Sequence, residues 1–308
     1  MKAISVDAVL LAGPTASGKS NAALVLAEQL GGMIVNADSM QVYREARILT
    51  ARPPDEDVWR VPHLLYGHVS VREPFSVGRY QGDAERALQE VRGSGRVPIF
   101  VGGTGMYFGV LTDGIANIPP VPAALRERVA ARRKEIGAEA FHAALAARDP
   151  ESAARLRVSD TQRTLRAYEV LEATGRPLSE WHKEIGKPLL AGMKLARFVL
   201  APPREELYAR IDARFDRMIE QGALEEAAAL AGLDLSLPAA KILGLRELRA
   251  VNAGTISLEE AKAAAKQATR QYAKRQLTWF RNRMNDWMWI EVTDRLEIAA
   301  MLSVSTAG

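Results

Sequence analysis

The sequence contains no cysteine in its 308 residues. Disulfide bonds and thiolate zinc sites are therefore excluded, and a reducing cytoplasm is the expected location. The chain also has no uninterrupted run of about 18 apolar residues, so we expect no membrane-spanning helix. Histidine is scarce, and its spacing fits no metal site; the four histidines are His63, His68, His142 and His182.

Acidic residues are missing from one long stretch near the end of the chain. The net charge is only +4, but residues 262–284 contain seven lysines and arginines and no acid. Lys262, Lys266, Arg270 and Lys274 recur every four residues, which predicts one positive stripe along a helix. Such an asymmetry of charge indicates a polyanionic partner.

The remaining composition is that of a soluble globular protein, with 48% hydrophobic and 25% charged residues. Short apolar runs alternate with helical patterns, which predicts an α/β fold whose parallel sheet is covered on both faces. Residues 114–194 read as helices only and predict a helical insertion domain, so the core domain would comprise 1–113 and 195–308. The predicted strands are 7–13, 32–38, 97–103, 196–202 and 287–293.

A glycine-rich loop follows the first predicted strand. The letters GPTASGKS match the pattern G-x-x-x-x-G-K-[ST] in full, between a strand and a helix, and this context is typical of a phosphate-binding loop. Its backbone N–H groups would cradle a di- or triphosphate, Lys19 would neutralise the outer phosphate, and the Ser20 hydroxyl would reach Mg²⁺. The loop consists of Gly13, Pro14, Thr15, Ala16, Ser17, Gly18, Lys19 and Ser20.

Two further features stand at the ends of predicted strands. Asp38 ends the second strand and is expected to face the same crevice as Lys19, although it could instead cap a following helix. A hydrolytic P-loop enzyme usually has an acid after a later strand. Here Gly102, Gly103 and Thr104 occupy that place, which permits a close backbone approach and offers a hydroxyl, unless the segment is a plain turn.

Six motifs in order give the chain a specific resemblance. They are GPTASGKS, NADSMQVYR, VGGTGMY, DTQRTLRAYEV, GLRE and QYAKRQLTWFR. Together they resemble bacterial tRNA dimethylallyltransferases, the isopentenyl-tRNA transferase family, over roughly residues 6–292. The resemblance implies a P-loop NTPase-like sheet with a helical insertion. It also implies transfer of a dimethylallyl group from dimethylallyl diphosphate to the N6 amine of the adenosine 3′ of the anticodon, with release of diphosphate.

The resemblance also implies roles for individual residues. The phosphate loop would hold the diphosphate of the allylic donor, with Mg²⁺ at Ser20, and Lys19 would stabilise the departing diphosphate. Asp38 would orient and deprotonate the amine, and Thr104 would lie beside the reacting centre. The family also clamps the diphosphate with an arginine; Arg214 is the candidate and Arg210 the second choice, unless both are surface charges.

The tRNA contacts implied by the resemblance come from several segments. Some of these residues could equally form the polar face of an amphipathic helix, and Trp279 and Phe280 could stack on bases or, for at least one of them, pack in the core. No membrane and no obligate protein partner is expected, and we expect a monomer. The implied tRNA-binding residues are Asp38, Ser39, Met40, Gln41, Arg126, Gln162, Arg163, Arg166, Lys241, Arg246, Lys274, Arg275 and Arg281.

Three other functions remain open on the sequence. A small-molecule kinase of the shikimate or nucleotide kinase type would share the loop and the aspartate at the strand end, but the basic stretch disfavours it. A P-loop protein that only binds RNA is disfavoured by the ordered catalytic motifs. An enzyme that prenylates free adenine nucleotides is disfavoured by the length and by the tRNA-type motifs.

Overall fold

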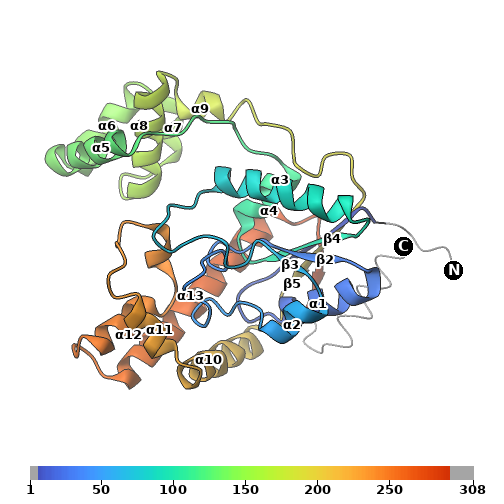
Figure 1. Ribbon diagram of the computed structural model, residues 1–308. Coiled ribbons are helices and arrows are strands. Elements are labelled where there is room, and N and C mark those ends of the chain that lie inside the picture. Colours follow the sequence, from blue (N-terminus) through green and yellow to red (C-terminus); the bar gives the residue numbers. More distant parts are fainter. Residues whose placement is uncertain (1–5, 292–308) are drawn as a thin grey trace. The chain divides into compact units, whose positions relative to one another are not determined.

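The computed structural model describes residues 6–291. Within these residues the strands form one six-stranded sheet in the order β3-β2-β4-β1-β5-β6, and every pairing in it is parallel. The predicted α/β fold is thereby confirmed (Figure 1). Residues 292 and 293 of the last predicted strand lie outside the described part. The strands are β1 (Ala8–Ala12), β2 (Met33–Asn36), β3 (His63–Leu64), β4 (Pro98–Gly102), β5 (Leu195–Leu200) and β6 (Met288–Ile290).

The short strand β3 was not predicted, because two residues give no periodicity that a sequence pattern can detect. The central strands β1 and β4 are buried along their whole length, as continuous apolar runs require. Helix α1 (Lys19–Leu30) packs on one face of the sheet, while α3 (Val77–Gly93) lies on the other (Figure 1). The register of β1 against β4 brings Gly13 beside Gly102, whose carbonyl accepts the Gly13 N–H at 3.2 Å.

The chain divides into two compact units. Residues 110–191 form one unit, and the residues before and after them form the other, which contains the sheet. The domain boundaries expected from the sequence, 114 and 194, stay a prediction of domain organisation. No helix among the described residues is long and apolar enough to span a bilayer.

The sheet-containing unit has helices both before and after the helical unit in the chain. They are α1, α2 (Asp55–Arg60), α3, α4 (Gly105–Thr112, which continues into the other unit), α10 (Arg204–Glu220), α11 (Ala223–Ala229), the 3-10 helix η1 (Pro238–Lys241), α12 (Leu245–Asn252) and α13 (Leu258–Arg283). Helix α13 begins at a capping box, in which Ser257 and Glu260 each bond the other's backbone N–H. It is the long basic helix that the sequence predicts.

The basic stripe of α13 is largely not open to a partner. Lys266 Nζ lies 2.7 Å from Asp216, and Arg270 Nη1 lies 2.7 Å from both carboxylate oxygens of Asp212. Lys262 is also 3.3 Å from Asp216. The interpretation of these three cations as contacts for a polyanionic partner is therefore wrong: they join α13 to α10. The acids recur at a spacing of four on α10 and match the spacing of the cations.

The other unit is built around a small core of its own. Phe141, Leu145 and Tyr168 are buried in it, and the Tyr168 ring is flanked by the guanidinium groups of Arg132 and Arg148. Its helices are α5 (Ala123–Ile136), α6 (Ala138–Ala146), α7 (Pro150–Arg155), α8 (Thr161–Thr174) and α9 (Leu178–Trp181). Buried Asp149 caps α7 through its carboxylate, which accepts the Ser152 N–H at 3.0 Å.

Candidate active site

The phosphate loop connects β1 to α1 with a backbone that leaves no room at its first glycine. A methyl group at Gly13 would lie 2.6 Å from the Ser17 hydroxyl oxygen and 2.9 Å from the Leu200 carbonyl oxygen. Lys19 closes the loop from the helix side, because its ammonium donates to the Pro14 carbonyl at 3.2 Å. The loop is thus preformed, with the N-terminus of α1 at its open side.

Lys19 is buried, with 9% of its surface exposed. Burial lowers its pKa from 10.5 to about 8, the nearby Asp38 carboxylate opposes that shift, and the Arg214 guanidinium adds to it. The positive charge of the buried Lys19 ammonium is therefore only partly neutralised by negative charge of the protein. A bound polyphosphate would supply the missing negative charge.

Asp38 lies two residues after the end of β2, at the edge where the strands end. Its backbone N–H is held by the side chain of the fully buried Asn36 at 2.8 Å, and its own Oδ1 accepts the Met40 N–H at 2.9 Å. No helix begins at the next residues, so the helix-cap alternative does not apply. The other oxygen, Oδ2, lies 3.2 Å from the place of a Cβ on Gly103.

Thr104 comes close to Asp38 through the neighbouring strand. Its hydroxyl oxygen accepts the Ser39 N–H at 2.9 Å, and its own N–H donates to the Ala37 carbonyl at 3.2 Å. The glycine before it permits this approach, since the Cβ position of Gly103 is 3.3 Å from the Gly13 carbonyl oxygen as well. The structure therefore brings Asp38, Thr104 and the phosphate loop together at one edge of the sheet.

An arginine of α10 reaches the phosphate loop. Arg214 Nη1 donates to the Thr15 hydroxyl at 3.3 Å. Burial lowers the pKa of this guanidinium, the positive charge of Arg217 lowers it further, and the Asp38 carboxylate raises it. Arg210, the second candidate, places Nη1 3.7 Å from the Cβ position of Gly18 and lies 3.9 Å from Glu206. Both arginines thus flank the loop from the same helix.

Three tyrosines interact electrostatically with Asp38, and sequence reasoning missed them. Burial raises the pKa of the hydroxyl groups of Tyr66, Tyr107 and Tyr272, and the Asp38 carboxylate raises each of them further. These hydroxyls therefore stay neutral and can donate hydrogen bonds. They come from three separate segments of the chain, which no local pattern relates.

Gln276 is a further residue that the sequence reasoning missed. Its carbonyl oxygen accepts the Thr15 N–H at 3.0 Å, and its amide nitrogen donates to the Gly103 carbonyl at 2.8 Å. It shares the buried side of α13 with Ala273 and Phe280, at helical spacing. A polar residue in an apolar stripe was the signal that could have found it.

The aromatic pair of α13 divides between core and site. Phe280 is fully buried, so the expectation that at least one of the pair packs in the core is confirmed. Trp279 covers the start of α4, since a Cβ on Gly105 would lie 2.2 Å from its ring. The Trp279 ring therefore lies next to the loop that carries Thr104.

The residues predicted to bind tRNA fall into two groups. In the sheet-containing unit, five predicted cations have exposed side chains: Lys241, Arg246, Lys274, Arg275 and Arg281. Gln41 is engaged within the protein, because its amide nitrogen donates to the Thr50 and Ala51 carbonyls at 3.0 and 2.7 Å. Ser39 and Met40 bond through their N–H groups to Thr104 and Asp38. These two therefore help to build the site.

The second group lies in the helical unit. Gln162 and Arg163 are exposed at the start of α8, and Arg163 Nη1 lies 3.4 Å from Asp160. Arg166 Nη1 lies 4.0 Å from Glu169. Burial raises the pKa of Glu169, and the charges of Arg126 and Arg166 lower it. Arg126, Arg166 and Glu169 thus form one electrostatic cluster within that unit.

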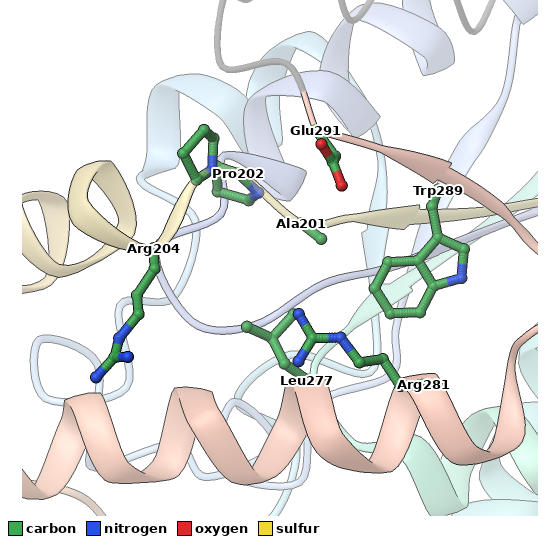
Figure 2. A pocket seen from close by; sticks show the side chains of 8 residues that line it. Ala201, Pro202, Arg204, Leu277, Arg281, Trp289 and Glu291 are labelled. Atoms are coloured by element: carbon green, nitrogen blue, oxygen red, sulfur yellow. The ribbon is translucent and has the colours of Figure 1, made fainter.

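A cavity of about 390 Å³ opens at the carboxyl ends of β5 and β6. None of the residues predicted for catalysis lines it, but Arg281 does. In the view of Figure 2, Trp289 and Arg281 lie at one end and Arg204 at the other. A smaller cavity of about 50 Å³ touches Thr15 and Arg214 directly, and its other walls are mostly apolar, including Leu49 and Phe215.

Comparison with known proteins identifies the family of the chain. The family described as IPP transferase matches residues 41–283, and that described as isopentenyl transferase matches residues 6–66. The chain is 53% identical to the tRNA dimethylallyltransferase of Bradyrhizobium sp. (strain ORS 278), over 92% of each chain. It is 55% identical to the enzyme of that name from Parvibaculum lavamentivorans, over 91% of this chain and 89% of that one.

Solved structures give the same result. The full-length tRNA isopentenylpyrophosphate transferase from Bacillus halodurans is 33% identical, with a TM-score of 0.68 over 98% of this chain and 97% of that chain. A eukaryotic dimethylallyltransferase acting on tRNA is 27% identical, with a TM-score of 0.81 over 94% of this chain and 75% of that chain. Because the likeness extends over nearly the whole chain in sequence and in fold, the chain belongs to the tRNA dimethylallyltransferase family.

Proposed function

We propose that this chain transfers a dimethylallyl group from dimethylallyl diphosphate to the N6 amine of the adenosine 3′-adjacent to the anticodon of tRNA. The observation that carries the proposal is the convergence of Asp38 and the phosphate loop around Gly103, with Asp38 Oδ2 and the Gly13 carbonyl oxygen 3.2 and 3.3 Å from its Cβ position. A base thus faces a diphosphate site. The chain also lacks the acid that hydrolytic P-loop enzymes place after β4, where Gly103 and Thr104 stand.

In the transfer, the amine nitrogen forms a bond to C1 of the donor while the bond from C1 to the diphosphate oxygen breaks. The electron pair leaves with the diphosphate, and the amine proton moves to the Asp38 carboxylate. Lys19, Arg214 and the loop N–H groups stabilise the charge that develops on the leaving group. The apolar walls of the 50 Å³ cavity beside Thr15 and Arg214 suit the hydrocarbon chain of the donor.

A divalent cation fits this site only together with the donor. Ser20 offers an exposed hydroxyl at the start of α1, and no group of three or more acids or histidines among the described residues could hold a metal. Mg²⁺ accepts such a ligand set, because it commonly combines a few protein oxygens with water and substrate phosphates. When bound, the ion would neutralise charge on the diphosphate.

The acceptor base must leave its stack to reach Asp38. The exposed cations of the sheet-containing unit and the cluster of Arg126 and Arg166 in the helical unit are the proposed contacts for the anticodon stem-loop. The chain is expected to act alone in the cytoplasm, where its tRNA substrate is found.

One assay separates this function from the three alternatives. The protein is incubated with labelled dimethylallyl diphosphate, labelled ATP, bulk tRNA and AMP. Label from the prenyl donor in tRNA supports the proposal. Phosphate transfer from ATP would indicate a kinase, prenylated AMP a nucleotide prenyltransferase, and tRNA binding without any transfer a simple RNA-binding protein.

The exposed cations of α13 allow a test of the tRNA interface. Replacing Lys274, Arg275 and Arg281 with Gln is expected to weaken tRNA binding and to flatten the slope of log K against log salt by roughly two to three units, at about 0.7–0.9 per phosphate contact. The measurement is a salt titration of tRNA binding by the wild type and the triple variant.

The matched control removes one charge of each sign from the pair that joins α10 and α13. The double variant Arg270→Gln with Asp212→Asn should keep the wild-type salt slope, because that guanidinium is already bonded to a carboxylate. If the salt slope changes in the control and stays constant in the triple variant, the RNA contacts have been assigned to the wrong cations.

A further inference from the structure

Gln276 connects two loops that belong to different strands of the sheet. Only 5% of its surface is exposed, although it lies in the most basic stretch of α13. Its amide bonds the Thr15 N–H on one side, at 3.0 Å, and the Gly103 carbonyl on the other, at 2.8 Å. One side chain thereby satisfies a donor of the phosphate loop and an acceptor of the loop after β4.

Both bonded groups stand next to residues of the proposed reaction. The Thr15 hydroxyl accepts a hydrogen bond from Arg214, which flanks the diphosphate site. Gly103 precedes Thr104, whose hydroxyl oxygen binds the Ser39 N–H beside Asp38. The backbone contact between β1 and β4 reaches Gly13 and Gly102, and Gln276 adds a bridge farther along both loops. Gln276 therefore links the backbone of the phosphate loop to the backbone of the loop after β4.

The fit around the amide is tight. A Cβ on Gly103 would lie 2.2 Å from the Gln276 amide nitrogen, so the glycine backbone and the amide are in direct contact. One turn later on α13, the Trp279 ring covers Gly105, the first residue of α4, which follows that loop. Gln276 and Trp279 thus both pack against the segment that follows β4. Of these two residues, only Gln276 also bonds the phosphate loop.

We propose that Gln276 is a positioning residue that sets the distance between the donor diphosphate and the acceptor amine. The proposal rests on the proposed prenyl transfer. Reacting atoms must approach to about 3–3.5 Å, and a misplacement of about 1 Å can lower a rate by about 10²-fold. Both hydrogen bonds of the Gln276 amide go to backbone groups of the protein.

The test compares three variants of the full chain. Gln276→Met keeps the length of the side chain and removes both hydrogen bonds. Gln276→Glu keeps the acceptor for Thr15, but as a carboxylate it cannot donate to the Gly103 carbonyl. Gln267→Met is the matched control, because Gln267 is exposed on the same helix. For each we measure kcat, the KM for donor and tRNA, and the melting temperature.

Gln276→Met is expected to lower kcat by about 10²-fold while the KM for tRNA stays constant. In Gln276→Glu, kcat relative to the wild type should rise as the pH falls, because the protonated carboxyl can again donate to Gly103. The Met variant should lack this dependence. A role in stability alone would not produce that difference between the two variants.

Several results would overturn the proposal. Transfer by the Met variant at the wild-type rate would mean that the bridge sets no distance. A loss of kcat matched by a loss of tRNA binding and of melting temperature, with no pH dependence in the Glu variant, would mean that Gln276 only supports the fold. If the wild type transfers no prenyl group in the same assay, the proposed function itself fails, which no behaviour of the variants can imitate.

Discussion

The Asp38→Asn variant is expected to lose transfer activity by about 10²–10⁴-fold in kcat, the usual contribution of a general base. The asparagine side chain has the same shape, and its oxygen can still accept the Met40 N–H that Asp38 accepts at 2.9 Å. It cannot accept the proton of the amine. The tRNA affinity should therefore change little, and the loss should appear in single-turnover rates of prenyl transfer at saturating donor.

Asp234→Asn is the matched control for this substitution. Asp234 is exposed and accepts the Ser236 N–H at 2.8 Å, two residues farther along the chain, in the same local geometry as Asp38 and Met40. The control should keep wild-type kcat and melting temperature. If Asp38→Asn also transfers at the wild-type rate, the acceptor proton goes elsewhere and the assignment of the base is wrong.

Sequence reasoning located the residues that follow the end of a strand better than the residues whose position depends on tertiary packing. Gly13, Lys19 and Asp38 could be placed together because carboxyl ends of parallel strands share one edge of a sheet, and the order of strands then has little influence. The same reasoning predicted Thr104 from the glycines before it. All four depend on motifs that are local in the sequence.

Side chains of the C-terminal helices were harder to predict. The spacing of Lys262, Lys266 and Arg270 correctly indicated one face of a helix but not what that face meets. Asp212 and Asp216 lie about 50 residues earlier, and only the packing of α10 on α13 turns two complementary spacings into ion pairs. A charged stripe on its own cannot distinguish an intramolecular acid from a nucleic acid.

Gln41 shows a related limit. Its motif indicated an RNA contact, whereas its amide nitrogen supports the segment around Thr50 and Ala51. Ala51 has a positive φ of 50°, so this segment needs support from outside its own backbone. A polar side chain in a motif can serve the loop that presents the site, and the sequence alone does not separate the two uses.

Lys19→Ala is expected to lower kcat/KM for the donor by about 10²–10³-fold, as the loss of one preorganised donor to a developing anion does. The ammonium faces the phosphate loop and is almost fully buried. Its removal therefore takes a positive charge away from the diphosphate site, and a neutral water molecule cannot restore that charge. The tRNA affinity should remain unchanged. The exposed Lys194→Ala serves as the control for the loss of one positive charge in the same unit.

The pH dependence identifies the ammonium as the group responsible. Burial lowers the Lys19 pKa to about 8, so the free enzyme loses this proton as the pH rises through 8. Because the diphosphate binds the protonated form, the wild-type KM for the donor should rise above pH 8, by up to about tenfold per pH unit. Lys19→Ala should show no such rise, and Lys19→Arg, which stays charged, should show none either. A variant that alters only tRNA affinity, with the donor KM unchanged at every pH, would mean that the loop does not hold the donor diphosphate.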